Sequence, residues 1–164
     1  MPTHKSVHIE HVGGNHFHAV PSSGHPYDYD DRESNQGASP VETVLSALAA
    51  CSAMDVISIA IKKRQHVVSY RIHVEGTQRD EYPQIFPEIT ITHEVIGPDV
   101  DAAAIRRCVE LSATKYCPVS AMLSAGDTVI HHRYHVIDTG ATPSEVEGEV
   151  IATGPYARPD VVPA

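Results

Sequence analysis

Three cysteines and twelve histidines supply most of the side chains in this sequence that could act as nucleophiles or metal ligands. Cys117 lies in the stretch TKYCPVSAML, directly before a proline and a run of small and apolar residues that predicts a helix. Just before a helix begins, unpaired backbone N–H groups and the positive end of the helix dipole favour a thiolate over a thiol. We therefore expect Cys117 to be a reactive thiol.

The other two cysteines are expected in apolar helices. Cys51 lies in a helix that is apolar over a wide arc, so we expect it to be deeply buried, with Asp55 one turn further on. Burial and a nearby carboxylate both raise a thiol pKa, so Cys51 would need an activating group. Cys108 lies on the apolar side of a second helix, where a cysteine usually behaves as a small hydrophobe, and we assign it no chemistry.

The pattern of apolar residues and turn signals predicts an α+β domain. Ser39, Pro40 and Glu42 form a capping box that opens a long helix. Alternation of apolar and polar residues predicts half-buried antiparallel strands over residues 68–74 and 89–95. The remaining expected elements are strands at 6–12 and 16–20, a polar loop at 21–38, helices from Asp99 to about Tyr116 and from Pro118 to about Gly126, a strand at 128–137, and a tail or wrapping arm at 139–164.

Composition excludes several classes of partner. A chain of 164 residues fits one domain, and its formal charge of -9, with basic clusters confined to helices, argues against nucleic acid. The N-terminus lacks the features of a secretory signal. The apolar run from Val44 to Ile61 approaches membrane-spanning length, but its central Asp55 costs about 3 kcal/mol on insertion. We expect no membrane association and a cytoplasmic location.

Two motifs, together with the order of the expected elements, resemble the OsmC/Ohr family of thiol-dependent peroxidases. They are GASPVETVLSALAACSAMDV around Cys51 and KYCPVSAML around Cys117, and the likeness covers residues 1–138. The resemblance implies an intertwined homodimer in which antiparallel sheets wrap around central helices. It also implies that Cys51 attacks an organic hydroperoxide and that Cys117 resolves the product, in oxidative-stress defence, with a dithiol as reductant and no metal or organic cofactor.

The family's activating groups match this chain less closely. Peroxidases of the family use an arginine from the N-terminal strands and a glutamate at the start of the long helix. Residues 1–31 here contain no arginine, and Val41 stands where the glutamate is expected, with Glu42 one place further on. Glu42 remains a catalytic candidate, although the capping box already gives it a structural role. The other candidates for activating the thiol or binding the peroxide are His16, His18, Arg32 and Asp55.

Two alternatives to a peroxidase are considered. The missing arginine and glutamate favour a family member that binds an apolar ligand or senses oxidants. A metal-binding protein is the second alternative, because many histidines would meet if the N- and C-terminal strands paired. No two histidines lie one helical turn apart and no CxxC motif accompanies them, so we expect no metal. The histidines concerned are His8, His11, His16, His18, His131, His132 and His135.

Overall fold

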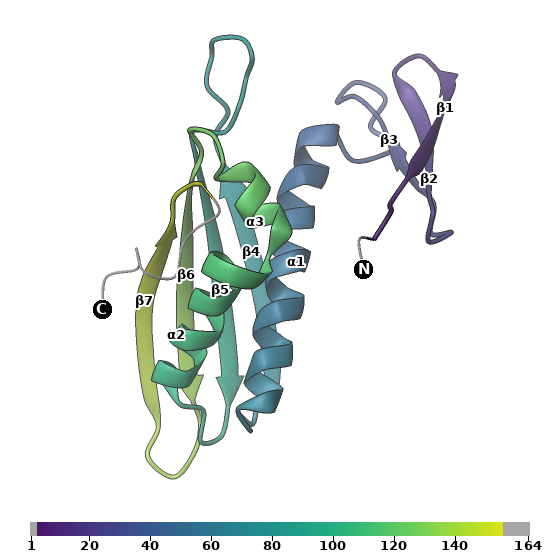
Figure 1. The fold of residues 1–164 in the computed structure, drawn as a ribbon. Coiled ribbons are helices and arrows are strands. Elements are labelled where there is room, and N and C mark those ends of the chain that lie inside the picture. The colour runs from purple at the N-terminus through teal and green to yellow at the C-terminus, as the bar shows by residue number, and fades with distance from the viewer. Residues whose placement is uncertain (1–2, 156–164) are drawn as a thin grey trace. The chain divides into compact units, whose positions relative to one another are not determined.

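The structure is a computed structural model that describes residues 3–155, and it divides into two compact units between Val44 and Leu45 (Figure 1). Each unit is described by itself. The first carries a small antiparallel sheet, and the second carries a larger mixed sheet with its helices. The α+β class predicted from the sequence is confirmed.

The first unit is a three-stranded sheet with the order β1-β2-β3, formed by β1 (Val7–Gly13), β2 (His16–Pro21) and β3 (Tyr27–Tyr29). The turn between β1 and β2 uses Gly14 at a φ of 55°, a left-handed conformation that favours glycine. The two predicted strands are therefore confirmed. The third strand was not predicted, because Tyr27 and Tyr29 stand in an otherwise polar segment and their edge-to-face contact forms only in the folded chain.

Helix α1 (Pro40–Lys62) begins at the predicted capping box. The Ser39 backbone N–H donates to Glu42 Oε2 at 2.8 Å, and the Glu42 N–H donates to Ser39 Oγ at 3.4 Å. These bonds satisfy backbone groups that a helix start leaves unpaired. The sequence therefore located the start of the longest helix correctly.

The second unit contains a four-stranded sheet with the order β4-β5-β6-β7. Strands β4 (Ser69–Gly76) and β5 (Glu88–Gly97) are antiparallel, as predicted. Strand β6 (Val129–Asp138) runs parallel to β5, because the connection between them crosses over through three helical segments. These segments are α2 (Ala102–Leu111), the π-helical turn η1 (Ser112–Tyr116) and α3 (Pro118–Leu123). The sheet is thus mixed rather than wholly antiparallel.

The edge strand β7 (Ser144–Ala152) pairs antiparallel with β6. It falls within residues 139–164, where a tail or wrapping arm was expected, and residues 156–164 lie outside the described part of the chain. Its glutamates lie on the exposed side while Val150 and Ala152 are buried. Gly148 is required by its partner on β6, because a Cβ there would collide with the Tyr134 phenol. The strand was not predicted from the sequence, because its segment is rich in glutamate and contains a glycine, which is unfavourable inside a strand.

The helices of the second unit lie along one face of this sheet (Figure 1). The core between them includes Leu48 and Val56 of α1, Ile105 of α2, and Ile91 of β5. Six polar side chains are also fully buried in the second unit, and burying a polar atom is costly unless it has a hydrogen-bond partner. They are Ser52, His93, Ser112, Ser120, Ser124 and His132.

Candidate functional site

The structure brings Cys51 and Cys117 together with Asp55. The two Sγ atoms and one carboxylate oxygen of Asp55 all lie within 4.8 Å of one another. Cys51 and Asp55 are one turn apart on α1, and Cys117 is the N-cap of α3. We expected Cys51 to be deeply buried, but it is only half-buried. Cys117, in contrast, is only 3% exposed. Of the two thiols, Cys51 is therefore the more accessible.

The prediction that the helix start makes Cys117 acidic is wrong. Burial, followed by a hydrogen bond with the Cys51 side chain, raises the pKa of Cys117 to about 12. The Ser120 N–H does donate to Cys117 Sγ at 3.3 Å, which acts in the opposite direction but is outweighed. Because α3 has only six residues, its dipole is short, and desolvation dominates.

A chain of hydrogen bonds runs from this cluster into the core. Ser112 Oγ donates to Asp55 Oδ2 at 3.1 Å, and the Ser112 and Ser52 hydroxyls are 3.1 Å apart. Ser52 Oγ lies 3.4 Å from His93 Nε2, and the Tyr70 hydroxyl lies 2.7 Å from His93 Nδ1. Burial raises the pKa of Asp55, with the Ser112 bond opposing it. These hydrogen bonds therefore form one network that ends at Asp55, beside the thiols.

Two buried histidines extend this network across the sheet. The rings of His93 and His132 are stacked, with centroids 5.9 Å apart. Burial lowers the pKa of His93 to about 4, and burial, followed by the charge of His93, lowers that of His132 to about 3. His132 Nε2 lies 3.4 Å from Ser120 Oγ, while its Nδ1 has no hydrogen-bond partner in the described chain. Both rings are therefore neutral at physiological pH.

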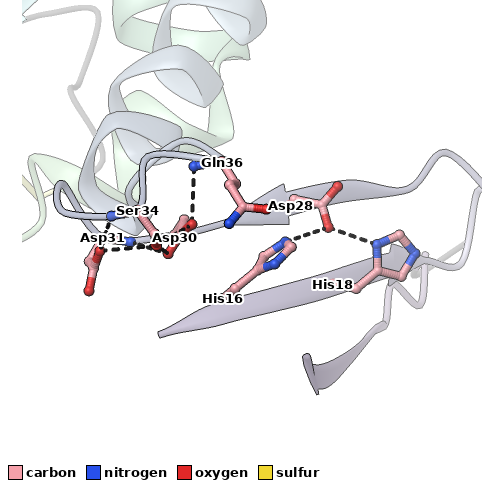
Figure 2. Close-up of polar contacts among 7 residues, drawn as sticks. All are labelled: His16, His18, Asp28, Asp30, Asp31, Ser34 and Gln36. Carbon is pink, nitrogen blue, oxygen red and sulfur yellow. Dashed lines mark hydrogen bonds and ion pairs between the residues drawn. The ribbon is translucent and has the colours of Figure 1, made fainter. Parts of the chain in front are cut away.

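The other predicted site residues belong to the N-terminal unit. His16 Nε2 and His18 Nδ1 both contact Asp28 Oδ1, at 3.2 and 3.0 Å (Figure 2). Hydrogen bonds from His18 and then His16 lower the pKa of Asp28. Glu42 is held by Ser39 in the capping box, and these bonds, followed by the charge of Arg32, lower its pKa. None of these contacts involves a thiol.

A loop with internal hydrogen bonds follows the strand that carries Asp28. The buried Asp30 carboxylate accepts hydrogen bonds from the Ser34 hydroxyl at 2.7 Å and the Gln36 N–H at 3.0 Å (Figure 2). These bonds lower the pKa of Asp30. The segment predicted as a simple polar loop thus has a defined internal structure.

A small cavity lies beside Cys117. It measures about 250 Å³ and is lined by residues 113–118 and Ala121. Lys115 is the basic residue in this lining, and its Nζ lies 5.2 Å from the centroid of the Tyr116 ring. The cavity gives the buried thiol a neighbouring space of the size that a small organic group requires.

Sequence analysis missed the network behind the thiols. Ser52, His93 and Ser112 come from three separate elements, so their proximity is a property of the fold. One signal was available: His93 occupies an inward position in the alternation of Ile89, Ile91 and Val95. A histidine in such a series is either paired or functional, because an unpaired polar group is costly to bury.

The alternative of a histidine metal site required the N- and C-terminal strands to pair, and in the described residues these strands belong to separate sheets. His8, His11, His16 and His18 belong to the first unit's sheet, whereas His131, His132 and His135 belong to β6 in the second. A separate exposed group, His135 with Glu145 and Glu147, places three potential ligand atoms within 4.8 Å of one another. His135 Nε2 lies 2.6 Å from Glu145 Oε1, within hydrogen-bonding distance on the protein surface.

Comparison with known proteins finds relatives in both sequence and structure. The sequence pattern of the family described as OsmC-like protein matches residues 33–132. Protein YhfA of Escherichia coli strain K12 is 38% identical over 129 residues, which cover 79% of this chain and 96% of YhfA. The crystal structure of a hypothetical protein from Aquifex aeolicus VF5 has a TM-score of 0.73 at 29% identity, over 86% of this chain and 100% of the other.

More distant structures share the fold. An OsmC-like protein from Mycoplasma pneumoniae has a TM-score of 0.73 at 17% identity, over 83% of this chain and 99% of the other. The organic hydroperoxide resistance protein OhrB of Bacillus subtilis has a TM-score of 0.56 at 19% identity, over 80% of this chain and 98% of the other. At such identities the likeness establishes the architecture.

Proposed function

We propose, because this chain belongs to the OsmC-like protein family, that it reduces organic hydroperoxides with Cys51 and Cys117. The observation that carries the proposal is the contact between two thiols of unequal exposure, one half-buried and one 3% exposed. A peroxide must reach the first thiol, whereas the second needs only to reach the first. The name of the fold relative OhrB supports the choice of substrate class.

The proposed cycle balances without a metal or organic cofactor. The Cys51 thiolate attacks the distal peroxide oxygen, the O–O bond breaks, and the alcohol leaves with a proton. Cys51 is now a sulfenic acid. Cys117 attacks its sulfur, and the sulfenic hydroxyl leaves as water with the Cys117 proton. Two thiols and one hydroperoxide thus give a disulfide, an alcohol and water, and an external dithiol restores the thiols.

Asp55 is the proposed proton acceptor in this cycle. The Cys117 thiol is protonated at neutral pH, because burial raises its pKa to about 12, so its reaction requires a nearby base. Asp55 has a carboxylate oxygen within 4.8 Å of both sulfurs, and burial raises its own pKa, which makes it a better base than an exposed aspartate. The Ser112 hydroxyl fixes its orientation.

The proposal predicts a defined product. One equivalent of an organic hydroperoxide should convert the reduced protein to a Cys51–Cys117 disulfide within one chain and leave Cys108 reduced, because Cys108 is fully buried and lies outside the thiol cluster. Peptide mapping by mass spectrometry identifies the linkage. Cross-linking through Cys108, or stable over-oxidation of Cys51 in the unsubstituted protein, would remove the resolving role from Cys117.

Turnover separates the peroxidase from the alternative of an oxidant sensor or ligand-binding protein, which the absence of arginine from residues 1–31 favours. Stopped-flow measurements with an organic hydroperoxide and with hydrogen peroxide, in the presence of a small dithiol, give the rate directly. A disulfide that forms once and is not reduced by the dithiol would favour the sensor. We place either function in the cytoplasm, where dithiol donors are maintained.

We also propose that the chain acts as a homodimer, because α1 leaves much apolar surface uncovered. Helix α1 is long and apolar enough to cross a membrane, as are the core helices of many other proteins. Only 28% of its most apolar stretch is buried in the single chain. Met54 is 71% exposed and Ile61 is 65% exposed. A second copy of the chain would cover this surface.

Light scattering tests the dimer. The protein should have twice the 17.8 kDa mass of one chain at micromolar concentration. Met54→Asp should shift the equilibrium toward monomer, because it puts a charge into the apolar surface. Val68→Asp is the matched control, since Val68 is 77% exposed but lies outside α1. A folded monomer in the unsubstituted protein, or equal effects of both substitutions, would contradict the proposed interface.

A further inference from the structure

The cluster of Cys51, Asp55 and Cys117 has the composition of a metal site as well as of a redox pair. Cys51 and Asp55 project from the same face of α1, because residues four apart on a helix are neighbours. Cys117 comes from the start of α3 and completes a triangle of two sulfurs and one oxygen whose corners are within 4.8 Å of one another. Three ligands from two helices thus converge on one point.

The spacing suits a tetrahedral zinc ion. Zinc binds cysteine sulfur at about 2.3 Å and carboxylate oxygen at about 2.0–2.2 Å, so two sulfur ligands of one ion lie about 3.8 Å apart. A sulfur and a carboxylate oxygen of one ion lie about 3.6 Å apart, so from distances of at most 4.8 Å each edge of the triangle needs to shorten by at most about 1.2 Å, within the reach of rotations about the side-chain bonds. Thiolates select zinc over magnesium and calcium, which prefer oxygen ligands.

The ligands are already held by neighbouring groups. Ser112 Oγ donates to Asp55 Oδ2 at 3.1 Å, leaving the other carboxylate oxygen for an ion. The Ser120 N–H donates to Cys117 Sγ at 3.3 Å, a bond that stabilises negative charge on the sulfur. Such outer partners orient ligands and are a regular part of zinc sites. Cys51 is half-buried, so water is available to this side of the cluster as a fourth ligand.

We propose that the reduced protein binds one zinc ion through Cys51, Cys117 and Asp55. Binding releases the two thiol protons and leaves both sulfurs at their reduced oxidation level. The same sulfurs cannot hold zinc and form a disulfide, so zinc and peroxide compete for one site. The inference concerns the ligand set alone, and it stands whether or not the protein turns over hydroperoxides.

Competition against a chromogenic zinc chelator measures the stoichiometry and the affinity. Reduced protein should bind one zinc per chain, and protein oxidised to the disulfide should bind none at this site. Cys51→Ser should weaken binding by more than the roughly ten- to hundred-fold that outer partners contribute. Ser112→Ala, which removes a hydrogen bond to Asp55 but no ligand, should weaken binding by about ten-fold. Cys108→Ser is the matched cysteine control and should leave the affinity unchanged.

Cobalt(II) provides a second readout that does not depend on affinity. Cobalt in the proposed site should give an intense thiolate-to-metal charge-transfer band in the near ultraviolet, lost in Cys51→Ser and Cys117→Ser and retained in Cys108→Ser. His135→Gln tests the exposed group of His135, Glu145 and Glu147. Zinc binding that survives Cys51→Ser, persists in the disulfide form or disappears in His135→Gln would overturn the proposal.

Discussion

Replacing Cys51 by serine is expected to lower the rate of organic hydroperoxide reduction by at least about 1000-fold, because a serine hydroxyl is a far weaker nucleophile toward peroxide oxygen than a thiolate. Stopped-flow measurement of peroxide consumption under a dithiol reductant gives the ratio. Cys108→Ser is the control: it removes a thiol that is fully buried outside the cluster and should leave the rate unchanged. A Cys51→Ser variant that retains the rate of the unsubstituted protein would show that another residue attacks the peroxide.

The companion variant Cys117→Ser separates attack from resolution. In the absence of a reductant it should consume one equivalent of peroxide and stop, with Cys51 held as a sulfenic acid that a 1,3-dicarbonyl probe labels. The two variants therefore differ in outcome: Cys51→Ser does not react, whereas Cys117→Ser reacts once. If instead Cys117→Ser failed to react and Cys51→Ser reacted once, the roles of the two cysteines would be exchanged.

Acid is expected to destabilise this protein steeply through the stacked pair of His93 and His132. In the unfolded chain each imidazole gains a proton below about pH 6.5, whereas burial lowers the folded-state pKa of His93 to about 4 and of His132 to about 3. Between these limits the unfolded chain binds more protons, so the free energy of unfolding falls as pH falls. Each histidine contributes a slope of up to about 1.4 kcal/mol per pH unit, or about 2.7 kcal/mol for the pair.

Urea denaturation between pH 7 and pH 4.5 measures this slope. His132→Gln should remove about half of it, because glutamine does not titrate, and His93→Gln should do the same. His73→Gln is the control, since it replaces a histidine whose side chain is 73% exposed, with its Nε2 3.6 Å from Glu75 Oε2. A slope that is unchanged by both core substitutions would mean that other groups, such as the hydrogen-bonded Asp28 and Asp30, cause the acid sensitivity.

Local sequence signals predicted the elements that position the site. The capping box at Ser39 and Glu42 predicted where α1 begins, and alternation predicted β4 and β5. These features depend on neighbours within a few residues. Strands β3 and β7 escaped prediction because their polar or glutamate-rich sequences become strands only by pairing with β2 and β6.

The chemistry of the site was harder to predict from the sequence than the elements that carry it. The expected acidity of Cys117 followed from its place before a helix, but its pKa depends on how much water the fold removes, and the fold removes nearly all of it. The network from Asp55 to Tyr70 likewise joins residues from α1, η1, β5 and β4. Such relations follow from packing, which a single sequence does not display.

The two thiols that meet in the cluster come from segments on either side of β4, β5 and α2. A bond between them would tie these elements into a closed loop. For a loop of this length the lost freedom of the unfolded chain is equivalent to about 3–5 kcal/mol, a large fraction of the stability of an ordinary domain. Oxidation would then add a reversible cross-link. Proteases that attack unfolded segments would degrade the chain more slowly while peroxide is present, and faster again once the disulfide is reduced.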